Sequence, residues 1–164
     1  TINVEEGNSK YYSENNCVIE SSTKKLVLGC GTSTIPSNIE IIGSFAFDSY
    51  DSLKGDLVVP EGVVEIQNSA FINCSGITNI ILPTTLISIY ANLNSFRNMY
   101  PSFYGCSALE SITIQASAPP TLDGSSAFSD LDNLSNIYVP AEAVDAYKAA
   151  SGWSDYADLI SAIQ

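Results

Sequence analysis

The same stretch of fifteen residues occurs three times in this chain of 164 residues, with one skeleton and different residues in the gaps. The copies are SAFINCSGITNIILP at 69–83, PSFYGCSALESITIQ at 101–115 and SAFSDLDNLSNIYVP at 126–140. A looser fourth copy, FAFDSYDSLKGDLVVP, ends at Pro60 and carries one extra residue. Repetition on this scale predicts that one structural unit is stacked several times.

The length of the repeat indicates what kind of unit is stacked. A second shared stretch, PSNIEIIGSFAF from Pro36 and PEGVVEIQNSAF from Pro60, completes the unit, and successive units span 24, 23, 32 and 25 residues. Periods of about 20–29 residues that contain L-x-x-L-x-L are typical of leucine-rich repeats, in which no coil buries its apolar edge without a neighbour. We therefore predict one domain over residues 1–164, a leucine-rich repeat solenoid of mostly short parallel β-strands and loops.

The N-terminal part departs from the repeat. Residues 1–35 are predicted to hold a partial coil and a β-hairpin, because Cys17–Glu20 and Lys25–Leu28 are strand-like and the polar turn SSTK joins them. The I-x-V pattern at residues 2–4 resembles the end of another strand. The chain does not begin with Met, and we expect Thr1 to lie inside a truncated coil with further sequence upstream.

The C-terminal part changes its period after the repeats, which occupy residues 36–139. Residues 140–164 show helical spacing in two segments, separated at Ser151–Gly152. Val144 and Tyr147 share one face, and a second face holds Tyr156, Leu159, Ile160 and Ile163. We predict a helical cap that covers the last coil, with a structural role for Trp153.

Two columns of residues are predicted to face solvent if the strands stack in register. The middle strand positions form the first column, made of Val58, Ile81, Thr113 and Tyr138. A polar column beside it holds Asn79, Ser111 and Asn136. Exposed β-branched and aromatic residues in one strip are a candidate recognition surface, although the preference of strands for these residue types explains them as well.

The third unit is nine residues longer than the one before it, and the excess falls between Ile89 and Phe103. Insertions in repeat proteins project from one face, often the binding face. This one contains residue types that are common at interface hot spots. The candidates are Phe96, Arg97, Met99 and Tyr100. Phe96 and Met99 are equally compatible with folding back onto the solenoid.

Few residues in the chain suggest catalysis or metal binding. The sequence has no histidine and no C-x-x-C pair, which argues against zinc and against a thiol activated by histidine. Cys74 and Cys106 occupy equivalent repeat positions and are expected to be buried, reduced thiols, while a bridge between Cys17 and Cys30, which flank the hairpin, stays open. We predict no cofactor and no enzymatic activity.

The acidic residues give only a weak metal signal. Asp48, Asp51 and Asp56 lie close together, but their spacing is not that of an EF-hand loop. No pair of carboxylates is singled out for glycoside hydrolysis either. With 18 acidic residues and a net charge of −12, a solvated acidic surface is the simpler interpretation, and it disfavours nucleic acid as a partner. No apolar run is long enough to insert into a membrane.

The stretch VVEIQNSAFINCSGITNIILP resembles the BspA-like leucine-rich repeat, whose unit reads P-x-x-V-x-x-I-G-x-x-A-F-x-x-C-x-x-L-x-x-I-x-I. Because the pattern recurs in register, the resemblance covers essentially the whole chain. It implies an extracellular or bacterial cell-surface protein that recognises a protein or glycan on host matrix or on another cell. The alternative is a structural spacer or assembly segment within a longer surface protein. A shared fold does not name the ligand.

Overall fold

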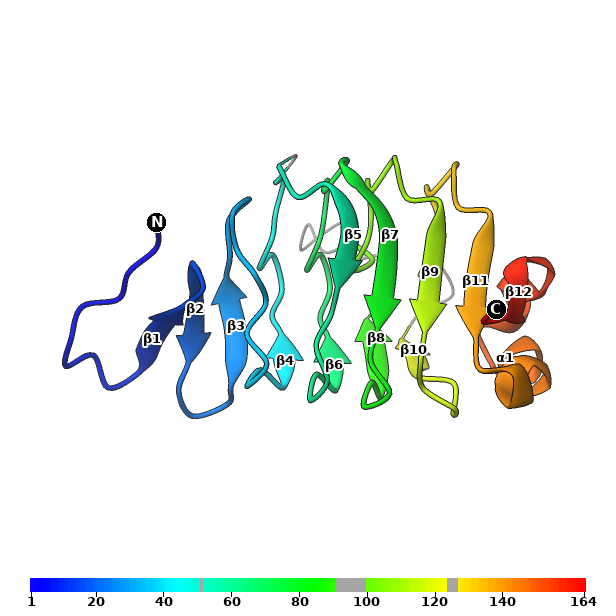
Figure 1. The fold of residues 1–164 in the computed structure, drawn as a ribbon, viewed down its shortest axis with the longest axis horizontal. Helices are drawn as coiled ribbons and strands as arrows, with labels where there is room; N and C mark the ends of the chain where they lie inside the picture. Colours follow the sequence, from blue (N-terminus) through cyan, green and yellow to red (C-terminus); the bar gives the residue numbers. More distant parts are fainter. Residues whose placement is uncertain (51, 91–99, 124–126) are drawn as a thin grey trace.

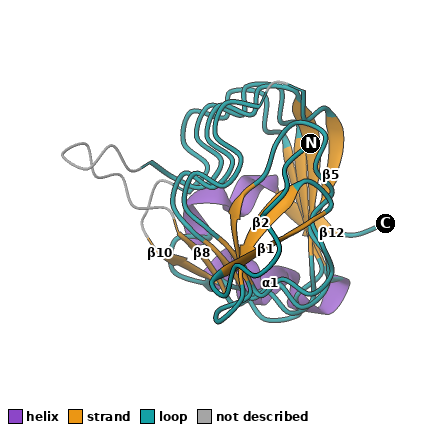
Figure 2. Ribbon diagram, turned by 90° about the vertical axis from the view of Figure 1, so that its left-hand side faces the viewer, coloured by secondary structure: helices purple, strands orange, loops and turns teal. Residues whose placement is uncertain are grey.

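The computed structural model describes residues 1–50, 52–90, 100–123 and 127–164. The coils stack side by side along one axis, with the first residues at one end and the last at the other (Figure 1). Viewed along this axis, the central coils carry strands on two different sides (Figure 2). This arrangement confirms the predicted solenoid.

Sheet A runs along one side of the stack and contains seven strands in the order β1-β2-β3-β4-β6-β8-β10. The first three strands pair antiparallel and the rest are parallel. The bounds are β1 Tyr11–Glu14, β2 Cys17–Glu20, β3 Lys25–Leu28, β4 Ile41–Ile42, β6 Glu65–Ile66, β8 Ser88–Tyr90 and β10 Thr121–Asp123. β2 and β3 thus pair over the residues of the expected hairpin.

Sheet B runs along a second side, and all of its strands are parallel. Their order is β12-β11-β9-β7-β5. The bounds are β5 Gly55–Val58, β7 Ile77–Leu82, β9 Ser111–Ile114, β11 Asn136–Val139 and β12 Ile160–Ala162. β5, β7, β9 and β11 correspond to the L-x-x-L-x-L part of the repeat, while β12 lies in the C-terminal segment. The short strands β4, β6 and β8 of sheet A lie in the second shared stretch, where the pattern did not predict them.

Two sequence-based assignments at the ends are wrong. Residues 2–4 do not form a strand, because side chains bind their backbone: Asn16 Oδ1 accepts from the Ile2 N–H at 3.3 Å and Ser13 Oγ accepts from the Val4 N–H at 3.0 Å. Residues 160–162 are not helical but form β12, which pairs with β11. The edge of sheet B supplies backbone partners that an isolated helical turn lacks.

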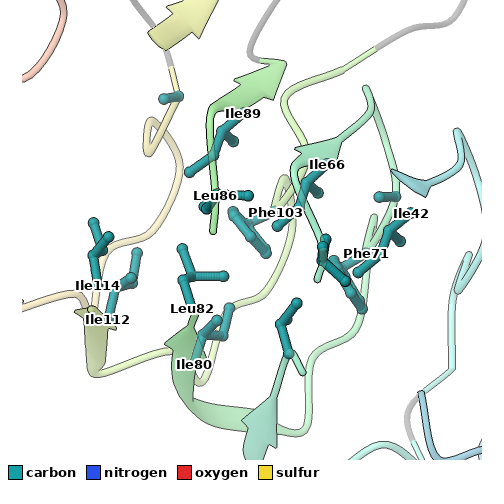
Figure 3. Packing of buried hydrophobic residues seen from close by; sticks show 14 of the residues in the cluster. Ile42, Ile66, Phe71, Ile80, Leu82, Leu86, Ile89, Phe103, Ile112 and Ile114 are labelled. Carbon is teal, nitrogen blue, oxygen red and sulfur yellow. The ribbon is translucent and has the colours of Figure 1, made fainter. Parts of the chain in front are cut away.

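The core is filled by ladders of equivalent side chains from successive coils. On sheet A the ladder runs through Ile42, Ile66 and Ile89, and all three are buried. The sheet B residues Ile80, Leu82, Ile112 and Ile114 point into the same interior (Figure 3). One coil therefore covers the apolar surface of the next, as the repeat spacing requires.

A column of aromatic rings runs through the centre of these ladders. Phe47 stacks on Phe71 with ring centroids 5.2 Å apart, and Phe71 stacks on Phe103 at 5.6 Å. The column continues through Phe128 at 6.4 Å and ends on Trp153, 5.6 Å further on. Because each ring touches rings of other coils, the column contributes mainly to the cohesion between coils.

The third side of the coil is a row of tight turns that follow each phenylalanine. The residue two positions after the ring always has a positive φ, which favours small or polar residues. These residues are Ser49 (59°), Asn73 (58°), Gly105 (76°) and Asp130 (62°). Backbone bonds cross from turn to turn, since the Phe47 N–H donates to the Ala70 carbonyl and the Phe71 N–H to the Ser102 carbonyl, each at 2.8 Å.

The C-terminal segment packs against the last coil. It contains the 3-10 turn Ala141–Ala143, helix α1 Val144–Ala149 and a second 3-10 segment, Ser154–Leu159, before β12. Tyr147 and Trp153 are fully buried. Trp153 Nε1 donates to the Pro120 carbonyl at 2.7 Å and the Tyr147 hydroxyl to the Ala116 carbonyl at 2.8 Å. Trp153 is therefore a structural residue that continues the aromatic column.

We predict that replacing the central ring, Phe71→Ala, lowers the free energy of unfolding by about 3–5 kcal/mol, because it leaves a cavity between two neighbouring rings. Denaturant titration followed by circular dichroism measures the loss. Ile87→Ala is the matched control, since that side chain is 64% exposed and its loss is expected to cost under about 0.5 kcal/mol. Equal losses in the two variants would contradict the central role of the column.

Burial raises the pKa of Tyr147 above its ordinary value of 10.0. The neutral hydroxyl therefore stabilises the fold at pH values below 10, and this contribution is lost as the pH rises from there toward the folded-state pKa. At pH 7 we expect Tyr147→Phe to be less stable than the parent by about 0.5–1.5 kcal/mol, through the lost hydrogen bond. Above pH 10 the difference should shrink by about 1.4 kcal/mol per pH unit. A difference that stays constant in unfolding titrations across this range would show that the hydroxyl is not protected by folding.

Candidate functional site

The outer face of sheet B carries the first predicted column in one unbroken row. Strand pairing places Val58 beside Ile81, Ile81 beside Thr113, and Thr113 beside Tyr138. We call these four residues the apolar column. Val58 is 57% exposed and the other three are partly exposed, so the side chains form a narrow strip on a backbone that the stack holds rigid.

A polar column runs beside it, two residues earlier in each strand, and consists of Asp56, Asn79, Ser111 and Asn136. The first three are hydrogen-bonded in series. Ser111 Oγ donates to Asn79 Oδ1 at 2.7 Å, and Asn79 Nδ2 donates to Asp56 Oδ1, also at 2.7 Å. Asn136 Nδ2 donates outside the column, to Ser135 Oγ at 2.8 Å. Because the series of three ends on the Asp56 carboxylate, acceptor oxygens remain for a ligand.

Asp56 was missed as a member of this column by sequence analysis. The fourth copy of the repeat carries one extra residue, which hides its equivalence to the other copies when they are aligned by their phenylalanines. The structure pairs Asp56 with Asn79 in the same register as Val58 with Ile81, and the pairing irregularity lies ahead of Asp56. The signal was the position two residues before Val58, since Asn79 likewise stands two residues before Ile81.

A pocket of about 230 Å³ continues the apolar column at its C-terminal end. Thr113, Tyr138, Ile163 and Gln164 line it. Ile163 is 41% exposed, and its N–H donates to the Val139 carbonyl at 2.9 Å. The sequence had placed Ile163 on a buried helical face, and the strand pairing of β12 is what turns it outward instead.

Most of the insertion in the third unit, including Phe96, Arg97 and Met99, lies outside the described residues. Tyr100 is partly buried, its ring stacks on Tyr104 at 4.7 Å, and its N–H donates to Ser69 Oγ at 2.9 Å. Because Ser69 lies between β6 of sheet A and Phe71, Tyr100 lies on a different side of the coil from the apolar column.

Two further pockets lie elsewhere on the molecule. One of about 200 Å³ is lined by Ser44, Gln67, Asn68 and Tyr90, at the ends of the short sheet A strands. The other, of about 340 Å³, lies between residues 31–35 and residues 52–58 beside β5. Both have mixed polar and apolar walls.

The thiols in the repeats are structural. Cys74 Sγ donates to the Phe47 carbonyl at 2.9 Å, and Cys106 Sγ donates to the Phe71 carbonyl at 3.2 Å. Burial raises the pKa of Cys106 to about 12, so this side chain is not a thiolate at neutral pH. Cys30 differs, because hydrogen bonds from Thr32 and Ser33 lower its pKa.

The described residues form neither a metal-binding cluster nor a membrane-spanning helix. In the part of the chain that the structure describes, no three His, Cys, Asp or Glu residues converge on one point. Asp51, one of the three clustered aspartates, lies outside that part. Among the described residues, no helix is long and apolar enough to cross a bilayer.

Comparison with known proteins identifies the repeat. A sequence model described as the BspA type leucine rich repeat region matches residues 29–150 in six copies. No curated protein matches the chain. A solved structure, titled as the crystal structure of the pneumococcal vaccine antigen PcpA, superposes with a TM-score of 0.54 at 18% identity, covering 99% of this chain and 50% of that one.

At that level of identity the superposition shows a common fold, and this chain spans about half the length of the PcpA chain. The family match covers most of the residues, and it follows the coils that the structure shows stacked in register. The chain belongs to the BspA-type leucine-rich repeat family.

Proposed function

We propose that the protein is a non-enzymatic recognition module of a bacterial cell surface, and that it binds a protein or glycan of a host or of another cell through the outer face of sheet B. The observation that carries this proposal is the pairing of the apolar column with the polar column, and the pocket that extends the first of them. Together they offer apolar contact, hydrogen-bonding groups and a concave end on one face.

The chemistry of the face favours a ligand that is rich in hydrogen-bond donors. Ser111 and Asn79 direct their donors along the polar column toward Asp56, which leaves oxygen acceptors exposed. Sugar hydroxyl groups and the side chains of Lys and Arg supply donors to such acceptors. The net charge of −12 points the same way, since it repels anionic partners and attracts cationic ones.

Two similarities to known proteins support a location outside the cell. Its family is that of BspA-type repeats, and PcpA, which shares the fold, is named a vaccine antigen. Secretion or anchoring of this chain is an inference from those similarities.

A second candidate function is that of a spacer or assembly segment within a longer surface protein. It is favoured by the extent of PcpA, about half of which this chain covers. In that case the residues of the apolar column are there for their strand propensity, and the isolated chain binds nothing.

The test is a binding screen of the full chain against extracellular matrix proteins, host cells and a glycan array, followed by variants. We expect Tyr138→Ala and Ile81→Ser each to weaken binding by about tenfold or more, as hot-spot residues do, with unchanged thermal unfolding. Ile87→Ala, an exposed residue outside the column, should bind like the parent. Parent-like binding by both column variants would refute the site on sheet B.

A deletion of residues 92–99 tests the insertion separately and retains Tyr100, whose backbone is bonded to Ser69. We propose Phe96, Arg97, Met99 and Tyr100 as a second contact surface. Binding lost only with this deletion would move the site from sheet B to the insertion. No binding by any form of the chain would support the spacer function.

A further inference from the structure

The first coil breaks the repeat at one position. Residues 31–36, GTSTIP, align with 55–60, GDLVVP, at the repeat distance of 24 residues. Ile35 is buried, as its counterpart Val59 is. Ser33, however, stands where later coils have the buried or partly buried side chains of the sheet B ladder, Leu57, Ile80, Ile112 and Ile137.

A serine at that position does not fill the core, and the first coil contributes no strand to sheet B, which begins at β5 in the part of the chain that the structure describes. The pocket of about 340 Å³ lies where such a strand would pair with β5. Residues 31–35 lie against the hairpin instead. Thr34 N–H donates to the Asn15 carbonyl at 3.3 Å.

The Ser33 hydroxyl joins this turn to the hairpin. It donates to the Asn16 carbonyl at 2.6 Å and accepts the Cys30 N–H at 2.7 Å. The same oxygen lies 3.5 Å from Cys30 Sγ, and the carbonyl of the next residue, Thr34, lies 3.8 Å from Cys17 Sγ. Residues 33 and 34 therefore contact both sulfur atoms.

The two thiols differ in their access to solvent. Cys17 begins β2 and is fully buried, with its sulfur 3.7 Å from the Asn15 carbonyl and 3.8 Å from that of Thr34. Cys30 follows β3 and is partly exposed, and Thr32 Oγ1 lies 3.3 Å from its sulfur. In the hairpin Val18 pairs with Leu28, so both cysteines lie just beyond that pair, at the open end of the strands.

We propose that Cys17 and Cys30 form an intramolecular disulfide in an oxidising environment, which ties the open end of the hairpin to the first coil. Both sulfurs contact neighbouring residues, Ser33 and Thr34, and these two residues are already bonded to the Asn16 and Asn15 carbonyls beside Cys17. Rotation of the two cysteine side chains exchanges these sulfur contacts for a bond between the sulfurs. This inference concerns the fold and does not rest on the proposed binding function.

The oxidant is a disulfide of small thiols, such as oxidised glutathione. The Cys30 thiolate attacks one of its sulfurs, forms a mixed disulfide and releases one glutathione thiolate. Cys17, after losing its proton, attacks Cys30 Sγ and releases the second glutathione thiolate. Two protein thiols are oxidised, and their two protons are taken up by the two glutathione thiolates, so one glutathione disulfide is reduced to two thiols.

The test is equilibration of the native full chain in glutathione redox buffers, followed by acid quenching, alkylation and peptide mass spectrometry. We expect one crosslink, between Cys17 and Cys30, while Cys74 and Cys106 remain thiols. We also expect the native chain to favour the crosslink by about tenfold or more over the denatured chain, because the fold holds the sulfurs near each other. In the oxidised protein, hydrogen exchange in β1 to β3 should slow by a similar factor.

Cys30→Ser is the matched control, because its hydroxyl keeps polar contacts at the turn while no crosslink is possible. Its hydrogen exchange should be the same in oxidising and reducing buffers. Three results would overturn the proposal. They are a stable mixed disulfide of Cys30 with glutathione in place of the crosslink, equal crosslinking in native and denatured chains, and faster hairpin exchange after oxidation.

Discussion

The rings of Phe47, Phe71 and Phe103 touch one another only across coil boundaries, and this contact defines how the protein is held together. A coil of 23 or 24 residues encloses too little apolar surface to offset the entropy of ordering its own backbone. Stacking supplies the missing burial, and it also satisfies the backbone, since hydrogen bonds pass between neighbouring coils on both sheets and along the row of turns. Stability in such a structure is mainly a sum over neighbouring pairs.

This dependence on neighbours explains what the sequence could reveal. Positions that repeat in every coil, such as the phenylalanines and the alternating residues of β7, β9 and β11, have their burial and register determined by the period alone. The apolar column could be predicted for that reason. The binding role of these residues could not, because strand propensity and ligand recognition select the same side chains at exposed positions.

Features determined by pairing rather than by pattern were harder to predict. β4 and β6 have two residues each, too few to show an alternation, and they exist because neighbouring coils present a partner. Ile160 and Ile163 are three apart, a spacing that fits a helix, yet the edge of β11 makes residues 160–162 a strand and exposes Ile163 to the pocket. Asp56 pairs with Asn79 in the same register as Val58 with Ile81, and the extra residue of its copy hid this equivalence in the sequence.

The two ends of the stack are completed by different interactions, and this difference has consequences for dynamics. At the C-terminal end Trp153 and Tyr147 cover the last coil with buried rings, which are hydrogen-bonded to the Pro120 and Ala116 carbonyls. At the hairpin end β3 pairs with β4 and places the buried Leu26 beside Ile42. On the side of sheet B, however, the junction is made by the Ser33 hydroxyl and a few backbone bonds, because serine occupies the core position. Polar contacts near solvent contribute less than buried aromatic area, so this side of the hairpin junction is the part of the stack that should open first. It is also the place where a covalent bond between β2 and the first turn would restrict the chain most.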